Sequence, residues 1–207
     1  MLEADAPLEY DDFNQTVTAS RNAVLTAEGI ILNADRITWN RQTSLVRADG
    51  SVSLGVVGYR LLAQSLILDL ASGTFTAEKV KTGMFPWVAE ADQMIANDSN
   101  YTLSNVSFRH ENHDRFSPSF LIDRTTYDIN STTAIAEGIG LSIDGKTIGR
   151  IPKIKRNLEG KEPRIELLGG EEQPLGWYAG VRFDAFETKN FSSDIEAISY
   201  FDRGIFL

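Results

Sequence analysis

The chain has 207 residues, no cysteine and a formal net charge of −9, and 42% of its residues are hydrophobic. This apolar content argues against disorder, and no apolar run is long enough for a transmembrane helix. The missing cysteines exclude disulfides and thiolate metal sites, and the negative charge argues against nucleic-acid binding, which depends on Lys and Arg. The first residues lack the basic and apolar segments of a signal peptide.

An internal repeat with a period of 29 residues occupies the first part of the chain. In each copy an apolar residue and an Asp or Asn precede an alanine by nine residues: Tyr10-Asp11 before Ala19, Trp39-Asn40 before Ala48, and Leu68-Asp69 before Ala77. The Asp and Asn residues stand at equivalent strand ends, which predicts that their side chains bond the local backbone of turns.

Within each repeat the apolar residues alternate as they do in β-strands. Between Val46 and Leu54 they fall on one face, and in the other strand of the repeat the alternation slips by one residue between Ala34 and Ile37. A β-bulge or corner at the slip would return both pairs to one face. Each repeat therefore predicts two strands, and because one repeat cannot bury its apolar face alone, stacked hairpins are expected to form a sandwich, jelly roll or solenoid.

The regularity weakens after about residue 90, and residues 109–119 predict a polar loop. Tyr127-Asp128 before Ala136 then restores the signature. From Gly176 two alternating runs of about ten residues, joined by a short polar segment, have the length and pattern of transmembrane β-strands. Two strands cannot close a barrel, so this part is expected to be a fragment of one.

Residues that could support chemistry are sparse. His110 and His113 lie in an acidic loop without a third ligand at a characteristic spacing, so no metal site is predicted. No catalytic constellation and no cofactor motif is recognisable, and we expect a protein that is not an enzyme. A local basic cluster permits two interpretations, contact with lipid phosphates or the membrane surface, or a strand with a basic outer face; it consists of Arg150, Lys153, Lys155 and Arg156.

The repeated apolar face also permits two interpretations. It would form a closed core, as most such faces do, or a groove that the alternation of small alanines with larger residues keeps slightly open to acyl chains. The sequence does not choose between the two.

The two segments "GIILNADRITWNRQTSLVRADGSVSL" and "GYRLLAQSLILDLASGTFTAEKV" resemble the OstA/LptA-like repeat of the lipopolysaccharide-transport family. The first matches the family signature through Ala34-Asp35, Trp39 and Ala48, whereas the second departs from it at Gln64 and Leu68. The segments "AEGIGLSIDGKTIGRIPKI" and "ISYFDRGIFL" are similar to the LptD-like outer-membrane members of that family. Such members often contain cysteines that tie their periplasmic and barrel parts together, and this chain has none.

The resemblance implies an all-β fold, a V-shaped β-jelly roll of stacked hairpins followed by the start of an outer-membrane-type β-barrel. The expected parts are residues 1–96 as the repeat jelly roll, 97–165 as its irregular continuation and a linker, and 166–207 as the first barrel-like hairpin. The implied function is non-enzymatic transfer of lipopolysaccharide across the periplasm to the outer membrane of a Gram-negative-type bacterium, with the acyl chains shielded inside the jelly roll. The expected lining consists of Val17, Ala19, Ile37, Trp39, Val46, Ala48, Leu66, Leu68, Phe75 and Ala77.

The expected partners are lipopolysaccharide, through its lipid A acyl chains, a periplasmic bridge protein of the same repeat family that adds to an edge strand, and an outer-membrane lipoprotein. No nucleic-acid partner is expected. The alternative from another class is a β-solenoid adhesin or carbohydrate-binding module without lipid transfer, which would have a filled interior and exposed aromatic platforms. A solenoid polysaccharide hydrolase is the third alternative and would need acidic residues that converge in one cleft.

Overall fold

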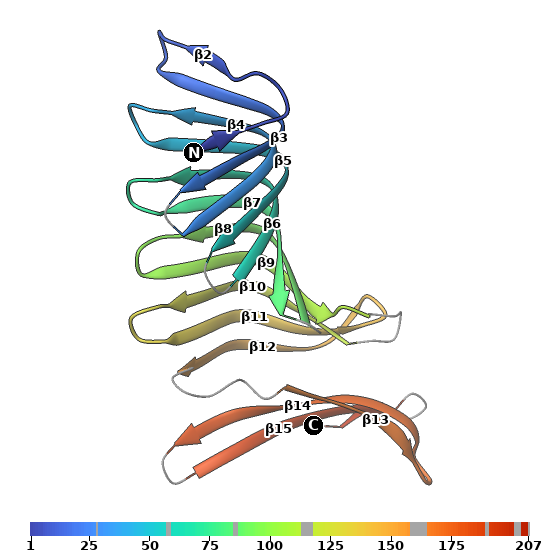
Figure 1. Cartoon of the computed structure of the whole chain (residues 1–207). Coiled ribbons are helices and arrows are strands. Elements are labelled where there is room, and N and C mark those ends of the chain that lie inside the picture. The colour runs from blue at the N-terminus through green and yellow to red at the C-terminus, as the bar shows by residue number, and fades with distance from the viewer. Residues whose placement is uncertain are drawn as a thin grey trace. The chain divides into compact units, whose positions relative to one another are not determined.

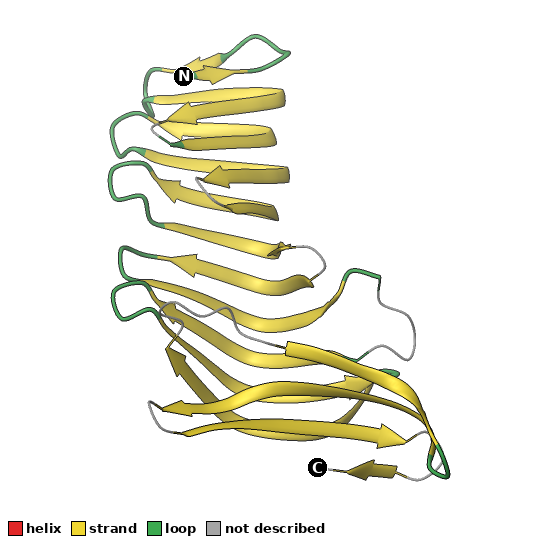
Figure 2. Ribbon diagram, turned by 60° about the horizontal axis from the view of Figure 1, so that its bottom comes forward, coloured by secondary structure: helices red, strands yellow, loops and turns green. Residues whose placement is uncertain are grey.

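The computed structural model of the chain describes residues 1–27, 29–56, 59–84, 87–112, 118–157, 165–188, 191–200 and 204–206. These residues form β-strands and no helix, so the expected all-β class is confirmed (Figure 2). The described part accordingly contains no helix that could cross a membrane.

The chain divides into two units, residues 1–157 and 158–207. The expected boundary at residue 96 is not a break in the structure, because the strands on either side of it are paired in one sheet. The first unit contains β1 Leu2–Glu3, β2 Glu9–Asp11, β3 Thr16–Ala27, β4 Ile30–Asn40, β5 Leu45–Val56, β6 Tyr59–Asp69, β7 Phe75–Met84, β8 Trp87–Ala96, β9 Asn100–His110, β10 Ser119–Asp128, β11 Thr133–Ile143 and β12 Lys146–Asn157.

All strands of the first unit belong to one antiparallel sheet, in which each strand from β3 to β12 pairs with the next strand along the chain. The sheet ends at β12 on one side, and on the other side the short strands β1 and β2 both pair with β3 and form its edge. The long strands bend near their middles, so that the sheet folds over and the two halves of its inner face lie opposite each other (Figure 1). Leu54 from one half and Phe75 from the other line the same cavity, which shows that the halves face each other.

The bend falls where the sequence alternation slips. The register shifts between Asn33 and Arg36 against β5, and Ala34 and Ile37 on either side of this shift are both buried, so the predicted corner is confirmed. Left-handed backbone turns the strands there, as at Gly50, whose φ is +75°. The carboxylate of Asp35 lies directly over Gly50, so that a side chain at residue 50 would overlap it.

The same corner recurs along the sheet. On β11 and β10, Gly138 has a φ of +65° and lies under the carboxylate of Asp123. At the other edge Asn22 donates its Nδ2 to Asp5 Oδ2 at 2.7 Å. The Ala-Asp motif therefore begins with Ala4-Asp5, one repeat before Ala34-Asp35, which was the first copy recognised in the sequence.

The predicted turns are confirmed by hydrogen bonds. Asn40 Oδ1 accepts the backbone N–H groups of Gln42 at 3.0 Å and Thr43 at 2.9 Å. Asp11 and Asp69 accept backbone N–H groups in the equivalent turns. The same arrangement continues past residue 90, where the sequence regularity weakens, because Asn97 and Asp128 cap the next two turns on this side of the sheet.

The second unit is a separate four-stranded antiparallel sheet in the order β13 Ile165–Glu172, β14 Gly176–Thr188, β15 Phe191–Tyr200 and β16 Gly204–Phe206. The predicted hairpin is present, since β14 pairs with β15. Arg182 on β14 forms an ion pair with Glu196 on β15 at 3.1 Å, and the Tyr200 hydroxyl donates to Glu172. The expected linker up to residue 165 includes residues 158–164, which lie outside the described part of the chain.

Candidate functional site

The inner face of the first unit is built from rows of side chains that run across the strands. One row, on the half that carries the capped turns, begins with Val17, Trp39, Val46, Leu68 and Phe75, which oppose one another in the strand register. A second row, nearer the bend, is formed by Ala19, Ile37, Ala48, Leu66 and Ala77. These ten residues are the lining predicted from the sequence, and the structure brings them together on the inner face.

The predicted lining is closed from β3 to β7. Nine of its ten side chains have exposures between 0% and 6%, and Trp39 is half-buried against the same core. The alanines next to the bend are packed rather than open, since Ala19, Ala48 and Ala77 are each 0% exposed. The suggestion that small residues hold the two halves apart is therefore wrong for these strands: alanines next to the bend let the halves approach closely.

The same rows continue on β9 to β12 with a different packing. The first row passes through Ala96 to Tyr101 and Tyr127, whose rings stack with their centroids 6.4 Å apart. The second row passes through Met94 to Leu103 and Thr125. Two further rows lie beyond the bend. We call the half-buried members of these rows the C-terminal inner face; they are Tyr101, Leu103, Phe108, Phe120, Ile122, Thr125, Tyr127, Ala136, Leu141, Ile151 and Ile154.

Residue size next to the bend differs between strands of the two parts. On β3, β4 and β6 the buried positions beyond the bend are Ala23, Ala34 and Ala63. On β10 and β12 the corresponding residues are Ile122 and Ile151, which are larger and half-buried. Bulkier residues on the concave side of the bend would hold the halves further apart at β10 and β12. Size is not the whole cause, because Ile139 between them is 6% exposed, and Val52 and Val80 in the closed part are 1% and 2% exposed.

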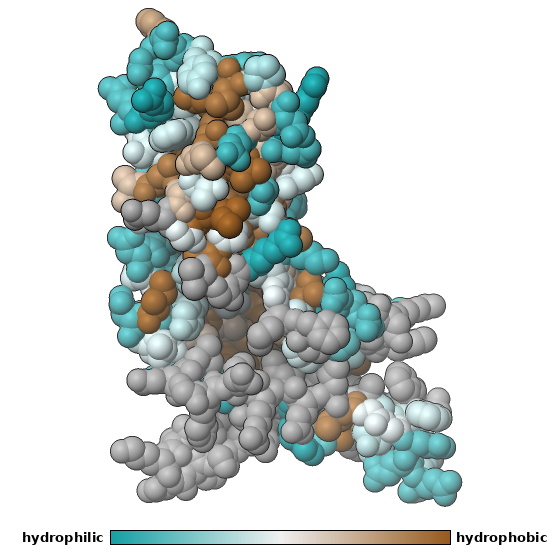
Figure 3. Space-filling view, viewed as in Figure 1, coloured by the Kyte–Doolittle hydropathy of each residue, from teal (hydrophilic) through white to brown (hydrophobic). Residues whose placement is uncertain are grey.

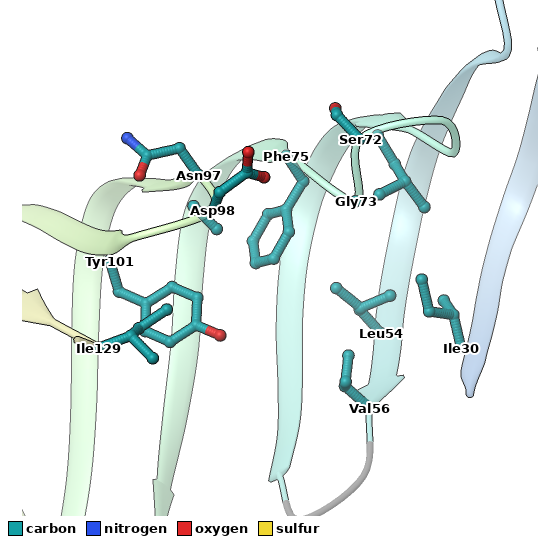
Figure 4. A pocket seen from close by; sticks show the side chains of 12 residues that line it. Ile30, Leu54, Val56, Ser72, Gly73, Phe75, Asn97, Asp98, Tyr101 and Ile129 are labelled. Carbon is teal, nitrogen blue, oxygen red and sulfur yellow. The ribbon is translucent and has the colours of Figure 1, made fainter. Parts of the chain in front are cut away.

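A cavity of about 210 Å³ opens between the two halves of the first unit. Its apolar wall includes Leu54 and Val56 from one half and Leu68, Phe75 and Tyr101 from the other. Figure 4 shows the Phe75 and Tyr101 rings on one side of the space and the aliphatic side chains of Leu54 and Val56 on the other. The turns after β6 and β8 form its polar rim. Of the predicted lining residues, Leu68 and Phe75 therefore border an unfilled space.

The surface view of this side of the molecule agrees with the burial pattern. Hydrophobic residues form a stripe along the N-terminal strands, with hydrophilic residues on both sides of it (Figure 3). The exposed apolar side chains Ile31, Ile67 and Leu121 lie on the separate strands β4, β6 and β10, with exposures of 52%, 48% and 44%.

Two buried polar atoms of the inner face have no hydrogen-bond partner within the described part of the chain, Trp39 Nε1 and Thr125 Oγ1. Thr125 belongs to the C-terminal inner face. An unpaired buried hydroxyl is costly, by about 1–3 kcal/mol, so a water or a ligand oxygen beside it would be stabilising.

The predicted basic cluster lies on β12, which pairs only with β11 among the described strands and so forms an edge of the sheet. Arg150 donates to both carboxylate oxygens of Asp123 at 2.9 and 3.1 Å. Lys153 donates to Glu137 at 2.8 Å, and this hydrogen bond lowers the pKa of Glu137. Lys155 and Arg156 follow on the same strand. Neighbouring carboxylates thus neutralise part of the cluster, which weakens its attraction for phosphates.

The histidine loop offers no metal centre in the described residues, where no group of three or more His, Asp or Glu side chains converges. His110 packs edge-on against Trp87, with ring centroids 5.6 Å apart, and Trp87 stacks on Phe108 at 5.2 Å. His113 lies outside the described residues.

No protein-family model and no curated protein matches this sequence. The candidate site is therefore identified from its geometry alone. Its C-terminal part was not predicted from the sequence. The signal was present, because Asn97 and Asp128 continue the series of turn residues and Tyr101 and Tyr127 continue the inner row.

Proposed function

We propose that this chain is a non-enzymatic lipid-transfer module that passes lipopolysaccharide toward the outer membrane by shielding its acyl chains against the C-terminal inner face. The observation that supports this most is the continuation of the inner apolar rows from a closed core into half-buried rows on β9 to β12. The resemblance of the repeat to that of the lipopolysaccharide-transport family supports the same proposal.

Acyl chains would lie against the side chains of Leu103, Phe120 and Ile154, and their head groups would stay in water. Each CH₂ that leaves water contributes about 0.8 kcal/mol, so even partial shielding of one chain would hold the lipid. The Thr125 hydroxyl, which has no partner in the described part of the chain, would donate to an ester or amide carbonyl of the lipid. No step of this transfer needs bond chemistry.

The partners follow from the sheet edges. A bridge protein of the same repeat type would add a strand at the β1–β2 edge or beside β12, since these strands end the sheet in the described part of the chain. Pro152 and the basic residues on β12 would discourage indiscriminate strand addition there. The outer-membrane lipoprotein partner, the periplasmic and outer-membrane location and a barrel that begins in residues 166–207 complete the proposal, and they depend on the resemblance alone.

Photo-crosslinking to lipopolysaccharide tests the proposal. A photoreactive residue at Leu103 or Phe120 would face the lipid, the same residue at Leu121 would point away on the outer face, and the one at Ala48 would report on the closed part. We expect crosslinks from Leu103 and Phe120 and none from Leu121. Ala48 should crosslink weakly, because its side chain is 0% exposed.

Equal crosslinking from Leu121 and Phe120 would mean that the lipid does not use the inner face, and the proposal would fail. A folded protein that gives no crosslink at any position would also overturn it and would favour the carbohydrate-binding alternative. Circular dichroism of each variant would show whether the sheet has formed.

A further inference from the structure

The cavity between the two halves lies beside the C-terminal inner face and shares Tyr101 with it. Its wall is made by residues that belong to the closed part, such as Leu54 and Leu68, each 1% exposed, and Ala96 at 3%. Ile30, Val56 and Ile129 complete its apolar boundary at the opening (Figure 4). Most of the cavity wall is therefore aliphatic or aromatic, and the cavity is open to solvent.

The volume sets the size of the group that fits. An apolar cavity of about 150 Å³ in a protein interior binds benzene, which has six carbons. Scaled from that case, the present cavity of about 210 Å³ accommodates roughly eight aliphatic carbons. This is too small for several acyl chains and suits a single one.

The rim sets the charge of the head group. Apart from the Tyr101 hydroxyl, which points into the space (Figure 4), the polar side chains are those of Ser72, Asn97 and Asp98 at the opening. Asp98 is the one charged residue among the described residues that line the cavity. Ser72 Oγ already donates to Asp69 at 2.9 Å, and Asn97 Oδ1 accepts the N–H of Asn100 at 2.8 Å. The free charge that a bound molecule would meet at the rim is therefore the exposed carboxylate of Asp98.

We infer that this cavity binds one alkyl chain of a single-chain amphiphile whose head group bears no negative charge. The chain enters between Val56 and Phe75 as far as about eight carbons, and the head stays at the rim beside Asp98. This goes beyond the proposed function, since it assigns a second ligand class to a second part of the interior. A phosphate head would be repelled by Asp98.

The first test is a series of alkyl maltosides with chains of six, eight, ten and twelve carbons, each used below its critical micelle concentration. Methyl NMR shifts of Leu54, Val56 and Leu68 report both the site and the affinity. Affinity should rise about fourfold per added CH₂ up to roughly eight carbons and change little beyond that length. A rise that continues to twelve carbons, or shifts confined to other methyl groups, would overturn the inference.

The second test changes the head group on an octyl chain. An octyl ammonium should bind at least as tightly as the neutral octyl glycoside, and octyl phosphate about fivefold more weakly. Asp98→Asn should remove the difference, whereas Asp12→Asn, the same change on a turn that does not line the cavity, should keep it. Equal binding of all three heads to the unmodified protein would contradict the role of Asp98.

The third test fills the opening. Val56→Phe should weaken binding of octyl maltoside at least tenfold, and Val24→Phe, which adds the same volume on the outer face of β3, should not. The chain-length series on the unmodified protein decides the question even if Val56→Phe disturbs the fold. Crosslinking of lipopolysaccharide at Leu103 and Phe120 is measured on other residues, so either proposal can fail without the other.

Discussion

Replacement of Leu66 by alanine tests whether β3 to β7 enclose a packed interior. Leu66 is 1% exposed, and its neighbours across the sheet are Ala48 on β5 and Ala77 on β7, both 0% exposed. Two alanines have no side-chain freedom with which to fill the space that Leu66 would leave. The loss should therefore fall in the upper part of the usual range for Leu→Ala, about 3–5 kcal/mol of unfolding free energy.

The adjacent residue provides the matched control. Ile67 points to the outer face and is 48% exposed, so Ile67→Ala should cost about 1 kcal/mol or less. Exchanging the sizes of residues 66 and 77 provides a second comparison. Ala77→Leu alone should overpack the interior at a cost of about 1–3 kcal/mol of unfolding free energy. In the double variant Leu66→Ala, Ala77→Leu, the new leucine would occupy part of the space left at residue 66. The loss of unfolding free energy should therefore be smaller than the sum of the two single losses.

Urea unfolding followed by tryptophan fluorescence measures these differences. A Trp177→Phe background restricts the signal to Trp39 and Trp87, both in the first unit, because the chain has three tryptophans. The reasoning would be refuted if Leu66→Ala cost no more than Ile67→Ala, or if the double variant lost the sum of the two single losses. Either result would mean that the two halves of the sheet are not packed against each other around Leu66 and Ala77.

Three further predictions concern turns and corners, each measured as a shift in the urea midpoint. Asn40→Ala should cost about 1 kcal/mol, because two backbone N–H groups lose their acceptor. The pKa of Asp69 lies below its ordinary value of 3.8, mainly because the backbone N–H of Ala71 donates to it, so its stabilisation is present above about pH 4 and is lost as pH falls through the folded-state pKa. Asp69→Asn, which keeps the acceptor but does not titrate, should therefore lose stability less steeply in acid, and an unchanged acid profile would contradict the assignment. Gly50→Ala should cost more than Gly29→Ala, since both residues have positive φ but only the Cβ at residue 50 would meet a carboxylate; equal losses would contradict the corner geometry.

The sequence was sufficient for the features that repeat. The slip at Ala34 and Ile37 predicted the corner, the Asp and Asn residues predicted the turns, and the alternation predicted which side chains face inward. These features depend on neighbours within a hairpin, and the 29-residue period shows them several times. The antiparallel order of the strands then follows from short connections.

The sequence was not sufficient for the distance between the two halves of the folded sheet. Leu66 and Leu103 occupy the same inner row, yet Leu66 is buried in a packed core and Leu103 is half-buried. The difference depends on which residues lie opposite each other across the fold, and residues such as Leu54 and Phe75 border one cavity from the two halves without any fixed sequence separation. The cavity between them could not be predicted either, because an unfilled space does not change the pattern of apolar and polar residues in the sequence.

The order of the strands has a consequence for how the first unit folds. From β3 to β12 every pairing joins strands that are adjacent along the chain. Although sheets rich in distant pairings fold slowly, here each new hairpin closes only a short loop, and the loop-closure entropy stays small at every step. Assembly can therefore begin at the densely packed hairpins of β3 to β6 and extend by one strand at a time, in the direction in which the chain is synthesised. Amide hydrogen exchange should accordingly be slowest in β4 and β5 and become faster toward β12.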